Sequence, residues 1–144
     1  MSLLVERITR DDQLKSAYWI REQVFVLEQE VDPKAEYDEF ESQCAHFLAY
    51  LDDKPVGTAR WRVTPNGVKL ERFAVLEEAR GKGVGQALVT AVLNDIESNP
   101  KAIGKLKYLH SQLDAVPLYT KFGFEKAGDM FEECNILHYK MQLA

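Results

Sequence analysis

Apolar and polar residues along this chain follow two different spacings. Several short segments alternate with a period of two, which predicts half-buried strands, and longer segments repeat apolar residues every three or four positions, which predicts amphipathic helices. The expected strands are 4–8, 45–51, 56–63, 70–75, 106–111 and 136–141. The expected helices are 11–25, 84–96 and 114–121, with the acidic segment 30–43 as a loop or a short second helix.

Residues typical of turns separate these segments. Asp52-Asp53-Lys54-Pro55 and Pro65-Asn66-Gly67 divide three consecutive strands, which favours an antiparallel meander. Asn99-Pro100 ends the long helix, and the strand that follows it predicts a right-handed crossover. The pattern therefore predicts a single α+β domain over residues 1–144, built on a mixed sheet.

The composition fits one such domain and excludes several classes of protein. At 144 residues and 46% apolar composition the chain can build a substantial core. A net charge of −5 argues against a nucleic-acid partner, because phosphate backbones bind concentrated basic surfaces. The polar N-terminal residues and the shortness of every apolar run predict a cytoplasmic protein with no membrane partner.

The two cysteines, Cys44 and Cys134, lie far apart in the sequence and predict free thiols. Together with His46 and His138 they offer four potential zinc ligands. Their spacings match no common zinc finger, so we expect no metal and interpret them as structural thiols and strand histidines.

The segment 70–86 is typical of a strand, a glycine-rich basic loop and the start of a helix. Three glycines at alternate positions let the backbone approach a ligand without interference from Cβ atoms, so successive N–H groups can point at one anion. The following helix adds its positive dipole end, and Arg80 and Lys82 add charge. The loop therefore predicts a phosphate site; the alternative is an ordinary strand-to-helix turn.

Two nucleotide-binding motifs fail on this loop. A P-loop requires Gly-x-x-x-x-Gly-Lys-Ser/Thr, which neither glycine register supplies. A dinucleotide fingerprint requires a further glycine where Gln86 or Leu88 stands. The remaining pattern, Arg80-x-x-Gly83-x-Gly85 after a strand, resembles the coenzyme A pyrophosphate loop of the GCN5-related N-acetyltransferase (GNAT) family.

A second motif follows in the same order as in that family. Gln112 precedes Ala115, Tyr119 and the segment Phe122-Gly123-Phe124. In the family the tyrosine protonates the leaving thiolate and the polar residue contacts the pantetheine arm, so the resemblance assigns these roles to Tyr119 and Gln112. The alternative for Tyr119 is an aromatic core residue.

The order of strands and helices is also the one that this family uses. The resemblance implies the acyl-CoA N-acyltransferase fold, a central mixed, mostly antiparallel sheet flanked by helices, with a splayed strand pair at the coenzyme site. It implies an N-acetyltransferase in which a primary amine attacks acetyl-CoA, the acyl donor substrate, directly in a ternary complex. The implied coenzyme-binding residues are Phe73, Ala74, Val75, Arg80, Gly81, Lys82, Gly83, Val84, Gly85, Gln86, Gln112 and Tyr119.

Aminolysis of a thioester needs a neutral amine, and an alkylamine with a pKa of about 10.4 is almost fully protonated at neutral pH. A general base must therefore remove a proton. Glu71, on the strand that leads into the loop, is the best-placed carboxylate. The alternative for Glu71 is an ion pair with Arg21 or Arg72.

Arg21 lies on the otherwise apolar face of the first helix, so it needs a carboxylate partner. The candidates are Glu28, Glu36, Asp38 and Glu71. The acidic stretch after this helix is either a solvated face or a surface that attracts a cationic acceptor. Its acidic residues are Asp32, Glu36, Asp38, Glu39 and Glu41.

Two further segments are similar to the bacterial ElaA-like branch of the family: 21–29, and 131–138 near the C-terminus. That branch typically has an acidic-Gly-Ile-Pro-His run where this chain has 134–138 without the glycine and proline, so we expect a different last turn. His110, on the strand opposite the coenzyme, is either a second proton acceptor or a histidine satisfied within the sheet.

Two other functions stay open. A catalytically silent acyl-CoA-binding sensor would keep the glycine loop, and an interaction module would bind a protein partner instead. The sequence does not identify the acceptor, the acyl chain or the oligomeric state, although C-terminal strands in the family often meet across a homodimer.

Overall fold

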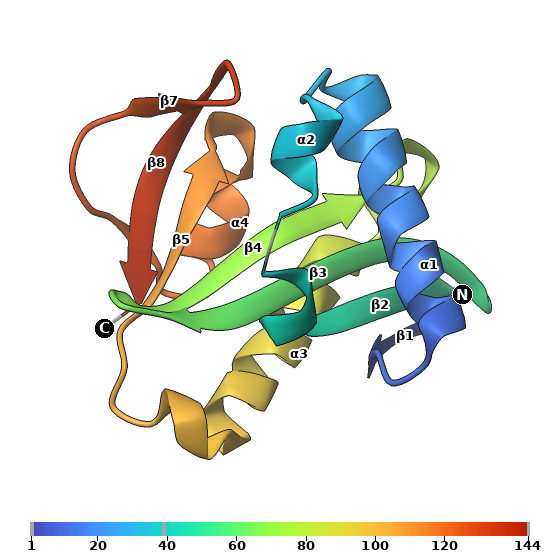
Figure 1. Cartoon of the computed structure of the whole chain (residues 1–144), viewed down its shortest axis with the longest axis horizontal. Helices are drawn as coiled ribbons and strands as arrows, with labels where there is room; N and C mark the ends of the chain where they lie inside the picture. The colour runs from blue at the N-terminus through green and yellow to red at the C-terminus, as the bar shows by residue number, and fades with distance from the viewer. Residues whose placement is uncertain (1, 39, 144) are drawn as a thin grey trace.

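A computed structural model of the chain describes residues 2–38 and 40–143. Its strands are β1 (Leu3–Arg7), β2 (Ala45–Leu51), β3 (Lys54–Thr64), β4 (Gly67–Val75), β5 (Lys107–Gln112), β6 (Glu125–Lys126), β7 (Phe131–Glu133) and β8 (Ile136–Leu143). They form one open sheet in the order β1-β2-β3-β4-β5-β8-β6, with β7 also paired to β8 (Figure 1). The pair β4–β5 is parallel and the other pairs are antiparallel, which confirms the predicted mixed sheet.

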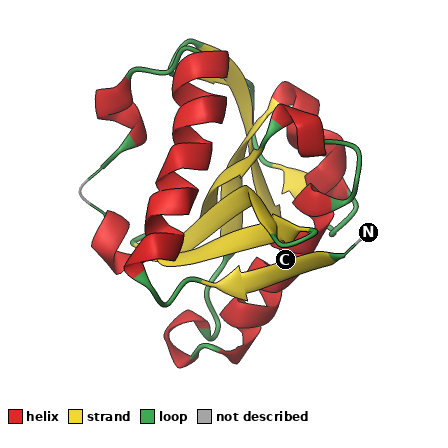
Figure 2. Cartoon of the chain, turned by 90° about the vertical axis from the view of Figure 1, so that its right-hand side faces the viewer, coloured by secondary structure: helices red, strands yellow, loops and turns green. Residues whose placement is uncertain are grey.

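Helices cover both faces of this sheet (Figure 2). They are α1 (Asp11–Arg21), the π-helical segment η1 (Glu22–Glu28), α2 (Pro33–Glu36), α3 (Val84–Ser98) and α4 (Val116–Thr120). Single 3₁₀ turns are η2 (Glu41–Gln43), η3 (Glu77–Ala79), η4 (Pro100–Ala102) and η5 (Leu113–Ala115). Within residues 2–38 and 40–143, none of the helices has both the length and the apolar character that crossing a membrane requires.

The first helix differs from its prediction in its last turns. The apolar spacing predicts one helix over 11–25, but α1 ends at Arg21 and the chain continues to Glu28 with π-helical hydrogen bonds. The Gln29 N–H donates to the Val24 carbonyl at 3.0 Å, five residues back. A π-helical turn is wider than an α-turn and is common at functional sites. In this protein η1 leads from α1 to Gln29, which lines the pocket described below.

One part of the core lies between the sheet and the long helix α3, and buried residues of α1 such as Ala17 and Ile20 also belong to the core. Leu88, Val89, Val92 and Ile96 of α3 are all at most 2% exposed. Gly57 of β3 permits this close packing, because a Cβ atom there would lie 2.9 Å from Val84 Cγ1. The N-terminus of α3, and with it the glycine loop, is therefore held directly against the sheet.

The parallel strands β4 and β5 pair over three residues each and then separate (Figure 1). Val68–Leu70 pairs with Lys107–Leu109. Beyond this point β4 contains a bulge, because the step from Glu71 to Ala74 opposes the shorter step from Arg60 to Thr58. Arg72 adopts a left-handed φ of 59° in the bulge. The predicted splayed strand pair is therefore present, and the space between its ends is open for a ligand.

Candidate active site

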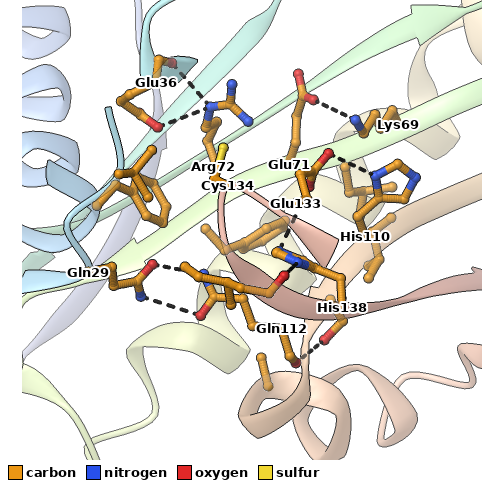
Figure 3. Close-up of a pocket in the computed structure, with 18 of the residues that line it drawn as sticks. Gln29, Glu36, Lys69, Glu71, Arg72, His110, Gln112, Glu133, Cys134 and His138 are labelled. Carbon is orange, nitrogen blue, oxygen red and sulfur yellow. Dashed lines mark hydrogen bonds and ion pairs between the residues drawn. The ribbon is translucent and has the colours of Figure 1, made fainter. Parts of the chain in front are cut away.

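A pocket of about 220 Å³ lies where β4 and β5 diverge (Figure 3). Strand β4 contributes Glu71 and Phe73, the end of β5 contributes Gln112, and α4 contributes Tyr119. These residues are the predicted ones that line the pocket, although they come from distant parts of the sequence. The Phe73 ring packs edge-on against the Tyr119 ring, with centroids 5.7 Å apart.

The glycine loop has the backbone that its sequence predicts. Gly81 has φ 75° and Gly83 has φ 84°, and α3 begins directly after Gly83. Residues that carry a Cβ atom rarely adopt a positive φ, so the backbone conformation of the loop favours glycine at both positions. A Cβ on Gly85 would lie 3.3 Å from Leu118 Cδ2, so the loop packs close to α4, the helix that carries Tyr119.

Arg80 is tied to the end of η1. Its guanidinium Nη1 and Nη2 donate to the two carboxylate oxygens of Glu28 at 2.7 and 2.6 Å. Its Nε donates to the Val75 carbonyl at 3.0 Å. The arginine also lowers the pKa of the Glu28 carboxyl. Glu28, a candidate partner of Arg21 in the sequence, is therefore the partner of Arg80.

Gln112 is held by a reciprocal amide pair. Its Nε2 donates to Gln29 Oε1 at 2.8 Å, and Gln29 Nε2 donates back to Gln112 Oε1 at 3.4 Å. Gln29 is the first residue after η1, so the end of the π-helical segment contacts β5 as well as the glycine loop. The sequence placed Gln29 in the segment 21–29 that resembles one branch of the family, but did not identify it as the partner of Gln112, because its position depends on the width of the π-turn.

Tyr119 is both a core residue and a pocket residue. It is 6% exposed and packs against Phe73 and Phe124, which agrees with the alternative interpretation of this residue. It also lines the pocket. Burial raises the pKa of the Tyr119 hydroxyl well above its usual value, so the hydroxyl keeps its proton at neutral pH. Pro117, which precedes it, lies in the first turn of α4, where proline is tolerated.

Glu71 forms ion pairs, but with partners other than those expected. One carboxylate oxygen, Oε2, lies 2.6 Å from Arg60 Nη2 and 2.9 Å from Arg62 Nε, and Oε1 lies 3.4 Å from Lys69 Nζ. The prediction of Arg21 or Arg72 was wrong because strand register places Glu71 opposite Arg60. Burial is the largest single influence and raises the pKa of this carboxyl, but the surrounding cations, Arg60 foremost, together outweigh burial and the pKa falls below its usual value.

Arg21 is 1% exposed, as its place on the apolar face of α1 predicted. Its partners are Glu36 and Glu41. Of the four candidates named from the sequence, only Glu36 is correct, and Glu41 was missed. Two carboxylates satisfy one buried guanidinium, which is the condition for burying it at a tolerable cost.

Arginine side chains of the sheet form ion pairs with carboxylates of the acidic stretch. Arg60, at 0% exposure, pairs with Asp38 at 2.7 Å and with Glu41 at 2.7 Å. Arg72 lies 3.3 Å from oxygens of Glu36 and Asp38. These three carboxylates are neither a solvated face nor free to attract a cation, so both interpretations of them are corrected. Glu39 lies outside the described residues, and Asp32 caps α2 through the Lys34 N–H.

Three further residues line the pocket: Glu133 was not identified as functional from the sequence, His138 was considered only as a zinc ligand or a strand histidine, and His110 was named as a possible second proton acceptor. Glu133 ends β7, His138 lies on β8, and His110 lies on β5 (Figure 3). Glu133 Oε1 is 3.5 Å from His110 Nδ1, and Oε2 is 3.8 Å from His138 Nε2. The resemblance of 131–138 to one branch of the family was the signal, but only strand pairing brings these side chains together.

The four residues considered as zinc ligands divide between different environments. Cys44 donates its Sγ–H to the Phe40 carbonyl, and burial raises its pKa to about 11. Cys134 is exposed in the β7–β8 turn. In the part of the chain that the structure describes, no three cysteine, histidine or acidic side chains gather in a metal-binding group.

The chain is similar to known proteins in both sequence and structure. The family model for an acetyltransferase (GNAT) domain matches residues 11–144. The uncharacterised N-acetyltransferase YjcF of Bacillus subtilis is 39% identical over 132 residues, which cover 91% of this chain and 92% of that protein. Escherichia coli ElaA has a similar structure, with a TM-score of 0.85 and 26% identity, covering 99% of this chain and 100% of that one.

Arabidopsis thaliana Naa50, solved in complex with the bisubstrate analogue CoA-Ac-MVNAL, is also similar. Its TM-score is 0.70 at 26% identity, covering 100% of this chain and 99% of that one. Similarity thus extends over nearly the whole chain in sequence and in structure. Because the family model and these relatives match along nearly their full lengths, this chain belongs to the GNAT acetyltransferase family.

Proposed function

We propose that the protein transfers an acetyl group from acetyl-CoA to a primary amine. The observation that carries the proposal is the pocket that is lined by Tyr119 and Gln112 and lies where β4 and β5 separate, together with the close packing of Gly85 in the glycine loop against Leu118 of α4. The loop would bind the coenzyme pyrophosphate, with N–H groups of 81–86 directed at it, and the pantetheine arm would lie between the diverging strands.

The reaction forms one C–N bond and breaks one C–S bond. The neutral amine attacks the thioester carbonyl, backbone N–H groups at 73–75 polarise that carbonyl, and the thiolate leaves with a proton from Tyr119. The raised pKa of Tyr119 suits this role, because the hydroxyl is protonated when the thiolate departs. Glu71 was the predicted base, but three cations surround its carboxylate and its pKa is lowered, so it is a weak proton acceptor.

The test is release of free coenzyme A thiol from acetyl-CoA in the presence of a panel of primary amines. Exposed Cys134 contributes a constant background to a thiol reagent, so a sample without amine serves as the baseline. Amine-dependent thiol release supports the proposal. Binding of acetyl-CoA without release from any amine would favour the catalytically silent sensor.

Binding of acetyl-CoA, measured without any amine, distinguishes the interaction module from both the enzyme and the sensor. A ligand that binds only the folded state raises its melting temperature. If saturating acetyl-CoA leaves the melting temperature unchanged, the glycine loop does not bind a coenzyme and the module becomes the better interpretation.

A further inference from the structure

Glu133 differs from the other carboxylates of the pocket. Among the described residues that line it, three are acidic: Glu36, Glu71 and Glu133. Glu36 pairs with buried Arg21, and Glu71 pairs with Arg60. The ion pairs of Glu133 within the described residues are with histidines only. Glu133 is therefore the pocket carboxylate that keeps a net negative charge when those histidines are neutral.

His138 presents an acceptor atom to this carboxylate. Its Nδ1 lies 2.7 Å from the Ile136 carbonyl oxygen, which can only accept a hydrogen bond. Nδ1 therefore carries the proton, and in the neutral ring the lone pair is on Nε2. Nε2 faces Glu133 Oε2 at 3.8 Å, too far for a direct hydrogen bond. Two acceptors facing each other at this distance are suited to a donor group that contacts both.

The positions of both side chains are fixed by their surroundings. The Phe131 ring stacks on His138 at 5.7 Å and meets His110 edge-on at 5.0 Å. His138 pairs with Gln112 across β5 and β8. Glu133 immediately precedes the two-residue turn Cys134-Asn135, in which both residues have positive φ, 53° and 64°. This is the backbone of a tight type I′ hairpin, which sets the direction of Glu133.

His110 completes the arrangement from β5. Within residues 2–38 and 40–143, its buried Nδ1 has no partner with hydrogen-bond geometry, but it lies 3.5 Å from Glu133 Oε1. The proximity of His110 lowers the pKa of the Glu133 carboxyl to about 2, so Glu133 is ionised at neutral pH. The lysine charge that acts on Glu133 is Lys69 of β4, whose Nζ is 3.4 Å from Glu71.

We infer that Glu133 binds the ammonium group of the acceptor, that His138 Nε2 takes its proton, and that His110 positions Glu133. The inference rests on the proposed amine acetylation and assigns its proton acceptor. An ammonium group has three N–H donors, so one can reach Glu133 Oε2 and another His138 Nε2. Transfer of one proton to Nε2 gives imidazolium and a neutral amine.

The remaining steps balance. The neutral amine forms the C–N bond and keeps one excess proton until the C–S bond breaks. That proton replaces the one that Tyr119 gives to sulfur, and His138 returns its proton to solvent. The sum is an alkylammonium and acetyl-CoA giving an N-alkylacetamide, coenzyme A and one proton.

Four variants test the inference in the full-length protein. Glu133→Gln should raise the KM for the amine about tenfold and leave the KM for acetyl-CoA unchanged, because it removes one charge-assisted contact. His138→Gln should lower kcat about a hundredfold near neutral pH, with activity recovering as pH rises and the amine deprotonates in solution. Glu132→Gln, an exposed neighbour on the same strand, is the matched control and should behave as wild type.

His110→Gln separates positioning from simple support of the fold. It should raise the KM for the amine, leave the KM for acetyl-CoA unchanged, and raise the pKa of the Glu133 carboxyl, measured by ¹³C NMR. A structural role alone would not move that pKa. If wild-type protein is active and both Glu133→Gln and His138→Gln keep its amine KM and kcat, the inference is overturned while the proposed function stands.

A binding measurement covers the case in which no amine is turned over. Butylammonium chloride, added to the protein saturated with coenzyme A, should shift the ¹⁵N resonance of His138 Nε2. The shift should occur in wild type and in Glu132→Gln and be lost in Glu133→Gln. An inactive wild type would refute the proposed function, and a silent His138 resonance in wild type would refute the inference.

Discussion

Arg80 and Glu28 form a two-pronged ion pair, at 2.7 and 2.6 Å, that joins the glycine loop to the end of η1. Glu28 is followed by Gln29, which pairs with Gln112 of β5. Glu28, the last residue of η1, thus contacts the glycine loop that follows β4, and Gln29, the first residue after η1, contacts the end of β5. Under the proposed function, coenzyme pyrophosphate bound at the loop would compete with Glu28 for the charge of Arg80.

Glu28→Gln should therefore tighten coenzyme A binding. The substitution removes a negative charge near the loop and frees Arg80 to face the pyrophosphate. Exposed ion pairs contribute at most about 1 kcal/mol, so the expected fall in Kd is up to about fivefold. Isothermal titration with coenzyme A measures it, with Glu22→Gln, an exposed glutamate of the same segment, as the control. Weaker binding by Glu28→Gln would show that the ion pair supports the site instead of competing with the ligand.

Gly83→Ala should weaken coenzyme binding at least tenfold. Gly83 has φ 84°, and no atom lies within 4 Å of the position its Cβ would take, so the methyl group would project into open space at the loop. Gly104 has φ 74° and equally open surroundings, but it lies outside the glycine loop, between η4 and β5. Both alanine variants should lose about 1–2 kcal/mol of stability from the left-handed backbone.

Because both variants carry the same backbone strain, a difference between them in coenzyme affinity reports the effect of the loop on binding. Urea denaturation measures the stability of each, and coenzyme A titration measures the Kd. Equal Kd values for Gly83→Ala and Gly104→Ala would mean that the loop does not contact the ligand.

Tyr119→Phe should lower kcat about a hundredfold and leave the Kd for acetyl-CoA nearly unchanged, because the proton-donating hydroxyl is removed while the ring stays in place. The pKa of Tyr119 is raised by burial, so its ionisation should not produce a fall in wild-type activity below about pH 10. Tyr108→Phe is the control, since the Tyr108 hydroxyl bonds Thr64 at 2.6 Å and lies outside the pocket. Wild-type kcat in Tyr119→Phe would refute its role as the acid.

Arg60→Met should destabilise the protein by about 3–5 kcal/mol, because it leaves Asp38, Glu41 and Glu71 facing one another without their shared cation. The measurement is urea denaturation at neutral pH. Arg10→Met, which removes an exposed ion pair with Asp12, is the control and should leave the denaturation midpoint unchanged. A midpoint for Arg60→Met equal to that of wild type would show that the three carboxylates are satisfied without Arg60.

The same cluster should make wild-type stability depend on acid. The folded pKa of Glu71 lies below its ordinary value of 4.5, so its stabilising effect is complete above that pH and is lost as the pH falls through the folded pKa. The pKa values of the Asp38 and Glu41 carboxyls are also lowered. Arg60→Met should therefore lose less stability on acidification than wild type does. An identical acid dependence in both proteins would contradict this origin.

Much of the fold followed from local pattern. The period-two segments became β1 to β5 and β8, and the apolar spacing of 84–96 became α3, because each element buries one face against the same core. The glycine loop was also predictable, since positive φ at Gly81 and Gly83 is a local demand of the backbone. The short strands β6 and β7 and the π-turns of η1 were not, because pairing with β8 and packing on the sheet determine them.

The sequence by itself determined the elements, the anion loop and the order of the two motifs, because these depend on neighbouring residues. Tertiary structure alone decided which charges meet. Strand register placed Glu71 opposite Arg60, so that it pairs with Arg60 instead of Arg21 or Arg72. The β7–β8 hairpin placed Glu133 beside His110 and His138. Ion pairs between distant residues depend on the placement of whole strands, and one position of slippage would turn each side chain to the opposite face.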